Sequence, residues 1–343
     1  EAEIISNLLK NLVHIGRKGY IYIKNDTLFA DNVEIMIGNS VLNLDGKIID
    51  NSKKTDFQIT GKDVPIEDIT SSLLYFQKIK DNSKKFMENF YDYSGTMQIN
   101  VQITEKGVFG ECRAINLSGK SVLFDVPILF KHVPFIFDGR TFKGGAFGTL
   151  GNEKVYADFN MINMATKEQE TTGTVQSVLT NKSVGTYVPE TSIKGSVDAS
   201  VNWHIKNKKI DVNYKVNVPE KSDIYHKNAA LGWEDKIRQI NVQTLKVEDK
   251  LKITKYEYAT ISDNVKTPVI YGEGMFTKQQ GKMTPDYITA KTQKDAPVDV
   301  AGSFYKYIKG GVFNGDLKYD FKKNKIVGTF DIKNSSFKNY KIN

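Results

Sequence analysis

The stretch that decides the fold spans residues 193–218 and reads IKGSVDASVNWHIKNKKIDVNYKVNV. Apolar and polar residues alternate over residues 193–205 and again over residues 210–218, and the polar turn Lys206–Lys209 separates the two halves. Successive side chains of a strand point to opposite faces, so each half is a strand with one apolar and one polar face. The stretch therefore predicts a long β-hairpin.

The hairpin pattern occurs twice more in the chain. Residues 311–333 repeat it without a gap, at an offset of 116 residues that aligns Gly195 with Gly311. A shorter version lies near residues 95–115. Repeats of one supersecondary unit predict an array whose members bury their faces jointly. The alternative is that any two amphipathic hairpins align equally well.

The composition describes a globular chain with a polar surface. Of its 343 residues, 40% are hydrophobic and 26% are charged, and the mean hydropathy is −0.40. These values exclude a disordered chain and leave room for one large or two medium domains. No uninterrupted apolar run approaches the roughly 18–20 residues of a membrane span. Because the chain begins at Glu1, we expect a processed form or a fragment that has lost a targeting or anchoring segment.

Charge and cysteine content narrow the expected partners. The net charge is +8, but the lysines come in pairs at expected turns, such as Lys208-Lys209, and the aromatic residues alternate away from them. A nucleic-acid-binding protein would gather lysines on one element with stacking aromatics, so no nucleic-acid partner is expected. Mild attraction to an anionic membrane surface remains open. Cys112 is the only cysteine, which excludes an internal disulfide.

The period of the apolar residues divides the chain into segments. Residues 1–14 carry a helical stripe, and strands are expected from Gly19 onward. Residues 65–93 return to helical spacing and predict a helical insertion of one or two helices. We therefore expect two domains. They are an N-terminal α+β segment over residues 1–93 and a β-rich repeat region over residues 94–343, with hairpins near residues 95–115, 193–218 and 311–333.

No residue constellation typical of a catalytic or metal site is found. The four histidines, His14, His132, His204 and His226, have no second ligand at metal-binding spacing, and no HExxH or paired CxxC motif occurs. Cys112 lacks the signature of a nucleophile and is interpreted as a buried or half-buried thiol. The glycine run KGGAFGTLG at residues 143–151 is better explained by turns or tight sheet packing than by a phosphate loop. The chain is therefore not expected to be an enzyme or to hold a metal or cofactor.

The long apolar strand faces raise the question of what covers them. A β-sandwich buries such a face against a second sheet, and a barrel folds it inward. A sheet curled into an open trough instead leaves the face to be lined by acyl chains. The apolar face mixes small residues such as Ala199 and Gly328 with large ones such as Trp203 and Phe330, which suits a bending sheet with room for a ligand. Ordinary curvature in a filled sandwich explains the same residues almost as well.

Residues 311–332 also carry a composite pattern, Gly-x-apolar-x-Gly-x-Leu-x-Tyr-x-Phe, a Lys/Asn turn, and then Ile-x-Gly-x-Phe. Looser copies occupy residues 195–218 and 94–103, and the helical interruption at residues 65–93 lies between runs of strands. In these features the chain resembles the AsmA-like family, which comprises AsmA-, TamB- and YhdP-type envelope proteins. The motifs are degenerate, and the chain departs from the family in lacking its N-terminal membrane helix.

The resemblance implies a mainly β fold with a few helices, in which long antiparallel strands form a curled, taco-shaped, groove-like sheet. A β-sandwich is the alternative fold. It also implies a bacterial periplasmic protein, anchored to the inner membrane through a segment absent from this chain, that carries phospholipids between envelope membranes without catalysis. Envelope protein partners fit the same role. A hydrophobic trough can do this because about 25 cal/mol per Å² of apolar surface must stay covered along the path, which needs no chemical step.

The residues expected to line such a groove share the apolar parity of the three hairpins. They are Met97, Ile99, Val101, Val197, Val201, Trp203, Val212, Tyr214, Leu317, Tyr319 and Phe330. The alternative is a structural or adhesion module, built as a β-sandwich or β-solenoid, that binds protein or glycan through its loops. An enzyme is the third candidate, and it would need converging polar groups that this pattern does not offer.

Overall fold

The chain folds almost entirely into strands. The structure is a computed structural model that describes residues 3–4, 13–15, 18–49, 54–73, 90–121, 124–164, 166–184, 190–228, 233–260, 270–279, 282–298 and 308–337. It is 81% strand and 3% helix, and its large antiparallel sheet is not closed. The predicted fold class, a mainly β protein with long antiparallel strands in an open, groove-like sheet, is thereby confirmed. The chain divides into two compact units, Glu1–Thr171 and Thr172–Asn343.

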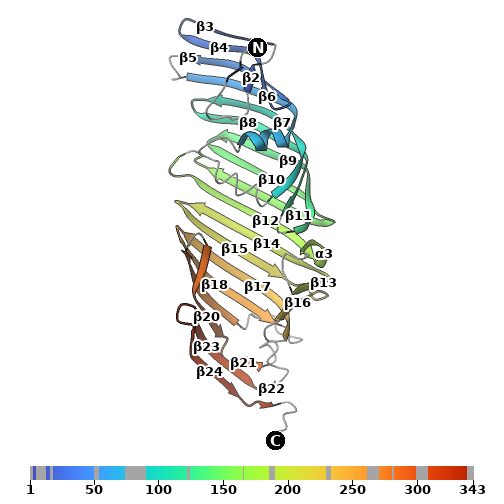
Figure 1. Cartoon of the computed structure of the whole chain (residues 1–343), viewed down its shortest axis with the longest axis vertical. Helices are drawn as coiled ribbons and strands as arrows, with labels where there is room; N and C mark the ends of the chain where they lie inside the picture. The colour runs from blue at the N-terminus through green and yellow to red at the C-terminus, as the bar shows by residue number, and fades with distance from the viewer. Residues whose placement is uncertain are drawn as a thin grey trace. The chain divides into compact units, whose positions relative to one another are not determined.

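The first unit is a meander of antiparallel strands (Figure 1). Its elements are β1 (Glu3–Ile4), β2 (Val13–Ile15), β3 (Tyr20–Lys24), β4 (Thr27–Ile37), β5 (Ser40–Ile49), β6 (Lys54–Pro65), α1 (Ile66–Leu73), β7 (Phe90–Thr104), β8 (Gly107–Ser121), β9 (Phe124–Gly139), β10 (Thr141–Leu150) and β11 (Glu153–Ile162). From β3 to β11 every strand pairs with the next one in the chain. Short turns make most of these connections, because antiparallel neighbours need only a hairpin, whereas the connection from β6 to β7 includes α1.

The second unit continues with the same strand type. Its elements are β12 (Glu170–Thr180), α3 (Asn181–Val184), β13 (Thr191–Lys194), β14 (Ser196–Lys206), β15 (Lys209–Asn217), β16 (Asp223–Asn228), β17 (Trp233–Val247), β18 (Lys250–Thr260), β19 (Ile270–Gln279), β20 (Lys282–Thr292), β21 (Ala296–Pro297), β22 (Ile308–Lys309), β23 (Val312–Asp320), β24 (Lys325–Lys333) and β25 (Ser336–Phe337). The main sheet places β12, β14, β15, β17, β18, β19, β20, β23 and β24 side by side. β16 bridges β13 and the start of β17, whereas β22 and β25 form a separate pair.

The three predicted hairpins are confirmed as β7–β8, β14–β15 and β23–β24. The turn of β14–β15 has positive φ at both Asn207 (50°) and Lys208 (62°). Two residues with positive φ are the mark of a type I′ turn, whose twist matches that of the strands it joins.

The two repeated hairpins differ in register by two residues. Lys209 pairs with Lys206 in β14–β15, whereas its counterpart Lys325 pairs with Asp320, two positions earlier than the repeat offset predicts. The second turn is correspondingly longer, with four residues, 321–324, between the strands. A shift of two residues preserves the face of every side chain, because strand side chains alternate with a period of two. Both hairpins therefore present the same parity to the same face.

Two helical predictions need correction. The helix predicted over residues 1–14 is wrong where the structure describes it, because Glu3–Ile4 and Val13–Ile15 are strands, and β2 pairs with the end of β4. The helical insertion predicted at residues 65–93 includes one helix, α1, but β7 already begins at Phe90. Residues 74–89 lie outside the described residues. The domain boundary predicted near Tyr93 falls inside β7.

Helix α1 covers part of the apolar face of the first unit. Its first residue, Ile66, is 5% exposed and packs in one cluster with Ala114, Val133 and Ala146 of β8, β9 and β10. Glu67 and Asp68 occupy the first turn, where the positive end of the helix dipole favours acidic side chains. A carboxylate oxygen of Asp68 also accepts a hydrogen bond from the backbone N–H of Asn39 at 3.2 Å, which ties the helix to the β4–β5 turn.

Many apolar side chains of the described strands are only partly buried. Fully buried ones gather in small clusters, such as Val197 with Ile224, whereas Tyr214 and Phe330 are 43% and 48% exposed. A filled sandwich would bury one face of each sheet completely, so this exposure fits an open sheet better.

Candidate functional site

Register identifies the side chains that share a face of the first unit, because directly opposite residues of an antiparallel pair point to the same side. One row crosses β5, β6, β7, β8, β9 and β10 and consists of Leu44, Ile59, Val101, Gly110, Phe137 and Phe142. The parallel row through Ile99 contains Leu42, Gly61, Cys112, Phe135, Gly144 and Phe159. The first unit therefore has one continuous apolar face.

The three site residues predicted in the first unit all lie on this apolar face. Ile99 is partly exposed, and Val101 is 9% exposed. Met97 pairs with Ala114 and packs against the cluster beneath α1. Met97 therefore contacts the cluster to which helix α1 contributes Ile66.

The eight site residues predicted in the second unit also share one face. A single row crosses β14, β15, β17, β18, β19, β20, β23 and β24 and consists of Trp203, Val212, Thr244, Ile253, Gly274, Ile288, Tyr319 and Ile326. This row joins the two repeated hairpins, which the sequence predicted separately. Neighbouring positions of the same parity hold the remaining predicted residues, Val197, Val201, Tyr214, Leu317 and Phe330.

Exposure separates these residues into open and filled positions. Tyr214 is 43% exposed and Phe330 is 48% exposed, although both belong to the apolar parity. Val197 is only 1% exposed and packs against Ile224 of β16 in a small core cluster. Val197 therefore belongs to a filled core and has no free surface for a ligand.

Large side chains on the apolar face lie over glycines of neighbouring strands. A methyl group at Gly272 would come within 2.6 Å of the ring of Tyr256, and one at Gly148 would come within 2.5 Å of the ring of Phe130. Aromatic rings of β9, β10 and β11 also contact one another, with centroids 4.6 Å apart for Phe137 and Phe142. Sequence analysis missed these aromatics as site residues, although the density of phenylalanine between residues 124 and 142 was a signal.

The hydroxyl of Tyr256 is one of the polar groups on the apolar face of the second unit. The hydroxyl of Tyr256 donates a hydrogen bond to the backbone carbonyl of Thr289 at 2.6 Å, and burial raises the pKa of this tyrosine. The hydroxyl of Thr289 accepts a hydrogen bond from the backbone N–H of Glu273 at 3.0 Å. The two side chains thus supply hydrogen-bond partners for the Thr289 carbonyl and the Glu273 N–H, at a place where the regular pairing of β19 with β20 is interrupted.

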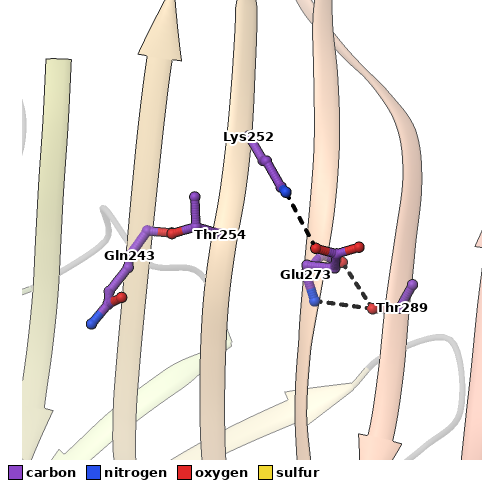
Figure 2. A network of polar contacts seen from close by, with 5 residues as sticks. All are labelled: Gln243, Lys252, Thr254, Glu273 and Thr289. Atoms are coloured by element: carbon purple, nitrogen blue, oxygen red, sulfur yellow. Dashed lines mark hydrogen bonds and ion pairs between the residues drawn. The ribbon is translucent and has the colours of Figure 1, made fainter. Parts of the chain in front are cut away.

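A polar network lies on the opposite face of β17, β18, β19 and β20 (Figure 2). The ammonium of Lys252 and the carboxylate of Glu273 are 3.5 Å apart, and the two side chains are 42% and 43% exposed. The hydroxyl of Thr254, at a bulge of β18, donates to the carbonyl of Gln243 at 3.2 Å. Exposed ion pairs contribute little to stability. The network is a solvated outer face and offers no converging acid, base or nucleophile.

Two features considered for chemistry in the sequence, Cys112 and the glycine run at residues 143–151, have structural explanations. Burial raises the pKa of the Cys112 thiol to about 11, assisted by the negative charge of Glu111 and partly offset by the backbone hydrogen bond of Asn100. Such a thiol is protonated near neutral pH and is a poor nucleophile. The glycine run at residues 143–151 lies mostly within β10, where Gly144 and Gly148 face aromatic rings, so the interpretation as tight sheet packing is confirmed.

Within the described ranges, no three histidine, cysteine, aspartate or glutamate side chains are grouped closely enough to hold a metal ion. The same ranges contain no helix with the length and apolarity of a membrane span. Comparison with known proteins finds no matching family, no similar curated protein and no similar solved structure.

Proposed function

We propose that the chain is a non-catalytic lipid-binding protein whose apolar face shields phospholipid acyl chains during transfer between the membranes of a cell envelope. The observation that carries this proposal is the row from Trp203 to Ile326, which crosses eight neighbouring strands on one face and carries apolar side chains on six of them, with Thr244 and Gly274 at the other two. The resemblance of the hairpin motifs to the AsmA-like family favours the same function. It adds a bacterial periplasmic location, an inner-membrane anchor outside this chain and envelope protein partners.

Continuity of the apolar face is the physical requirement. Each methylene group of an acyl chain that leaves its membrane for water costs about 0.8 kcal/mol. A gap in the cover would therefore act as a barrier, whereas a face without gaps lets the lipid move with little change in free energy. On the outer face, pairs such as Lys255 and Glu257, 2.7 Å apart, keep the sheet solvated.

Photo-crosslinking tests the proposal at defined positions. A photoreactive amino acid at Tyr214 or Val201 is expected to capture phospholipid when the purified protein is irradiated, and mass spectrometry of the adducts identifies it. The matched control places the same amino acid at Asn213 or Asn202, which are adjacent in sequence but lie on the other face. Organic extracts of the unirradiated protein should contain the same phospholipid.

Equal capture at both faces, or no lipid at either, would overturn the proposal. Adducts with a protein or glycan at the loops, together with a lipid-free apolar face, would instead favour the structural or adhesion module.

A further inference from the structure

The turn end of the second unit's strands carries an excess of positive charge. Register places the β14–β15 turn beside the β17–β18 turn, because Lys209 pairs with Val247, and the end of β19 beside both, because Lys250 pairs with Thr277. The β23–β24 turn lies at the same end, where the backbone N–H of Phe321 donates to the carbonyl of Asp286. We call this end the lysine edge. Its exposed lysines include Lys208, Lys209, Lys250, Lys278, Lys323 and Lys325.

The carboxylates at the lysine edge are fewer. The β17–β18 turn contributes Glu248 and Asp249. Asp320, at the end of β23, accepts a hydrogen bond from the backbone N–H of Lys323 at 3.0 Å, and Asp286 is engaged by the ammonium of Lys322 at 2.6 Å. At the opposite strand ends lysines and carboxylates are closer to balance, as in Glu220-Lys221 and Lys294-Asp295. Among the described residues of the second unit, the excess of positive charge is therefore larger at the turn end.

Exposed apolar side chains accompany the lysines at the β23–β24 turn. Phe321 is 39% exposed, Ile326 is 66% exposed and Val327 is 55% exposed. Phe321 also contacts the ring of Tyr319, with ring centroids 4.5 Å apart. Lysines beside exposed aromatic and aliphatic side chains suit the boundary between lipid headgroups and acyl chains. A nucleic-acid base could stack on Phe321, but Ile326 and Val327 offer no ring, so the aliphatic part of this surface favours a lipid layer.

We propose that the lysine edge docks on an anionic lipid bilayer through the β23–β24 turn. Its lysines lie against headgroup phosphates, while Phe321 and Val327 enter the interfacial layer. The docking surface meets the apolar face proposed to shield acyl chains at Ile326, but the docking does not depend on that face carrying lipid.

Vesicle flotation of the purified chain tests the docking. Vesicles of phosphatidylcholine with one third phosphatidylglycerol should bind the protein, vesicles of phosphatidylcholine alone should bind it weakly, and added salt should weaken the binding. Each lysine near the surface is worth about fivefold in affinity, so the double variant Lys323→Glu/Lys325→Glu should lose at least tenfold. The matched control, Lys221→Glu/Lys294→Glu, makes the same charge change at the opposite strand ends and should lose less than twofold. A second variant, Phe321→Ser/Val327→Ser, should weaken binding at unchanged charge.

Three results would overturn the docking. They are equal binding to neutral vesicles, equal losses in the edge and control variants, and a short DNA duplex that binds as tightly as the anionic vesicles and loses affinity in the same edge variant. Circular dichroism of each variant verifies the strand content. Lipid capture at position 214 should persist in Lys323→Glu/Lys325→Glu, so that failure of docking and failure of acyl-chain shielding give different results.

Discussion

The indole ring of Trp203 on β14 lies directly over Gly173 of the neighbouring strand β12, so closely that a methyl group at position 173 would overlap the ring. Tyr256 lies over Gly272 in the same way on β18 and β19. A large ring laid across a glycine covers backbone without help from a second layer of protein. Rings laid across glycines in this way help to keep the apolar face continuous, and the arrangement can be tested by substitution.

Gly173→Ala should displace the indole ring and lower the free energy of unfolding by about 1–3 kcal/mol, the usual cost of overpacking. Urea unfolding followed by tryptophan fluorescence measures both effects. Gly145→Ala is the matched control, because a methyl group there meets its neighbours at the ordinary distance of 3.4 Å. An unchanged emission spectrum and unfolding curve in Gly173→Ala would contradict the arrangement.

Acidic substitutions should separate the open part of the apolar face from its filled core. Val197→Asp places a carboxylate at a position that is 1% exposed and should prevent stable folding, because a buried unpaired charge is strongly destabilising. Tyr214→Asp, at a position that is 43% exposed, should leave the protein folded but reduce the lipid that co-purifies with it. Thermal unfolding and lipid extraction measure the two outcomes. Equal loss of stability in both variants would mean that the face around Tyr214 is filled.

Tyr256→Phe should cost about 1 kcal/mol, since it removes the hydrogen bond from the hydroxyl to the Thr289 carbonyl. The effect should depend on pH. Burial raises the pKa of Tyr256 in the folded state, so its stabilisation is fully present below the unfolded-state pKa of about 10 and is lost as pH rises through the folded-state pKa. Urea unfolding at pH 8 and above pH 10 should therefore show a smaller alkaline loss in Tyr256→Phe than in the parent. Parallel losses in both proteins would exclude this tyrosine as the cause.

Cys112 should react slowly with thiol reagents while the chain is folded. With a pKa of about 11, against about 8.5 for a free cysteine, its thiolate at pH 8 is about 200-fold less abundant. Alkylation by iodoacetamide should accelerate by about that factor in urea. Fast alkylation of the folded protein would show that the thiol is neither buried nor protonated.

The sequence predicted the strand faces because alternation is a local signal. Val201, Trp203 and Tyr214 were placed on one face from their parity alone, and the register of β14–β15 bears this out. The two-residue register difference of β23–β24 could not be predicted, since turn length follows from backbone pairing that composition does not reveal. The bulge at Thr254 could not be predicted from the sequence for the same reason.

The errors at the N-terminus have a physical cause. A stripe of apolar residues every three or four positions satisfies a helix, but the same residues also serve a strand that finds a partner. The end of β4, at Ile35–Ile37, supplies that partner for Val13–Ile15. Tertiary pairing therefore outweighs local periodicity there. The hairpin sequence also could not show that Ile224 packs against Val197, because Ile224 lies on β16, outside the hairpin.

Hairpin β23–β24 presents the same residue parity to the apolar face as β14–β15, although its turn is longer. Each described strand contacts chiefly the strands with which it is hydrogen-bonded. Sheets of this kind can gain or lose a whole hairpin without repacking anything distant. We expect relatives of different length to differ in steps of two strands, or about 9.6 Å of sheet width. Gene duplication could therefore widen or narrow the apolar face in steps of one hairpin.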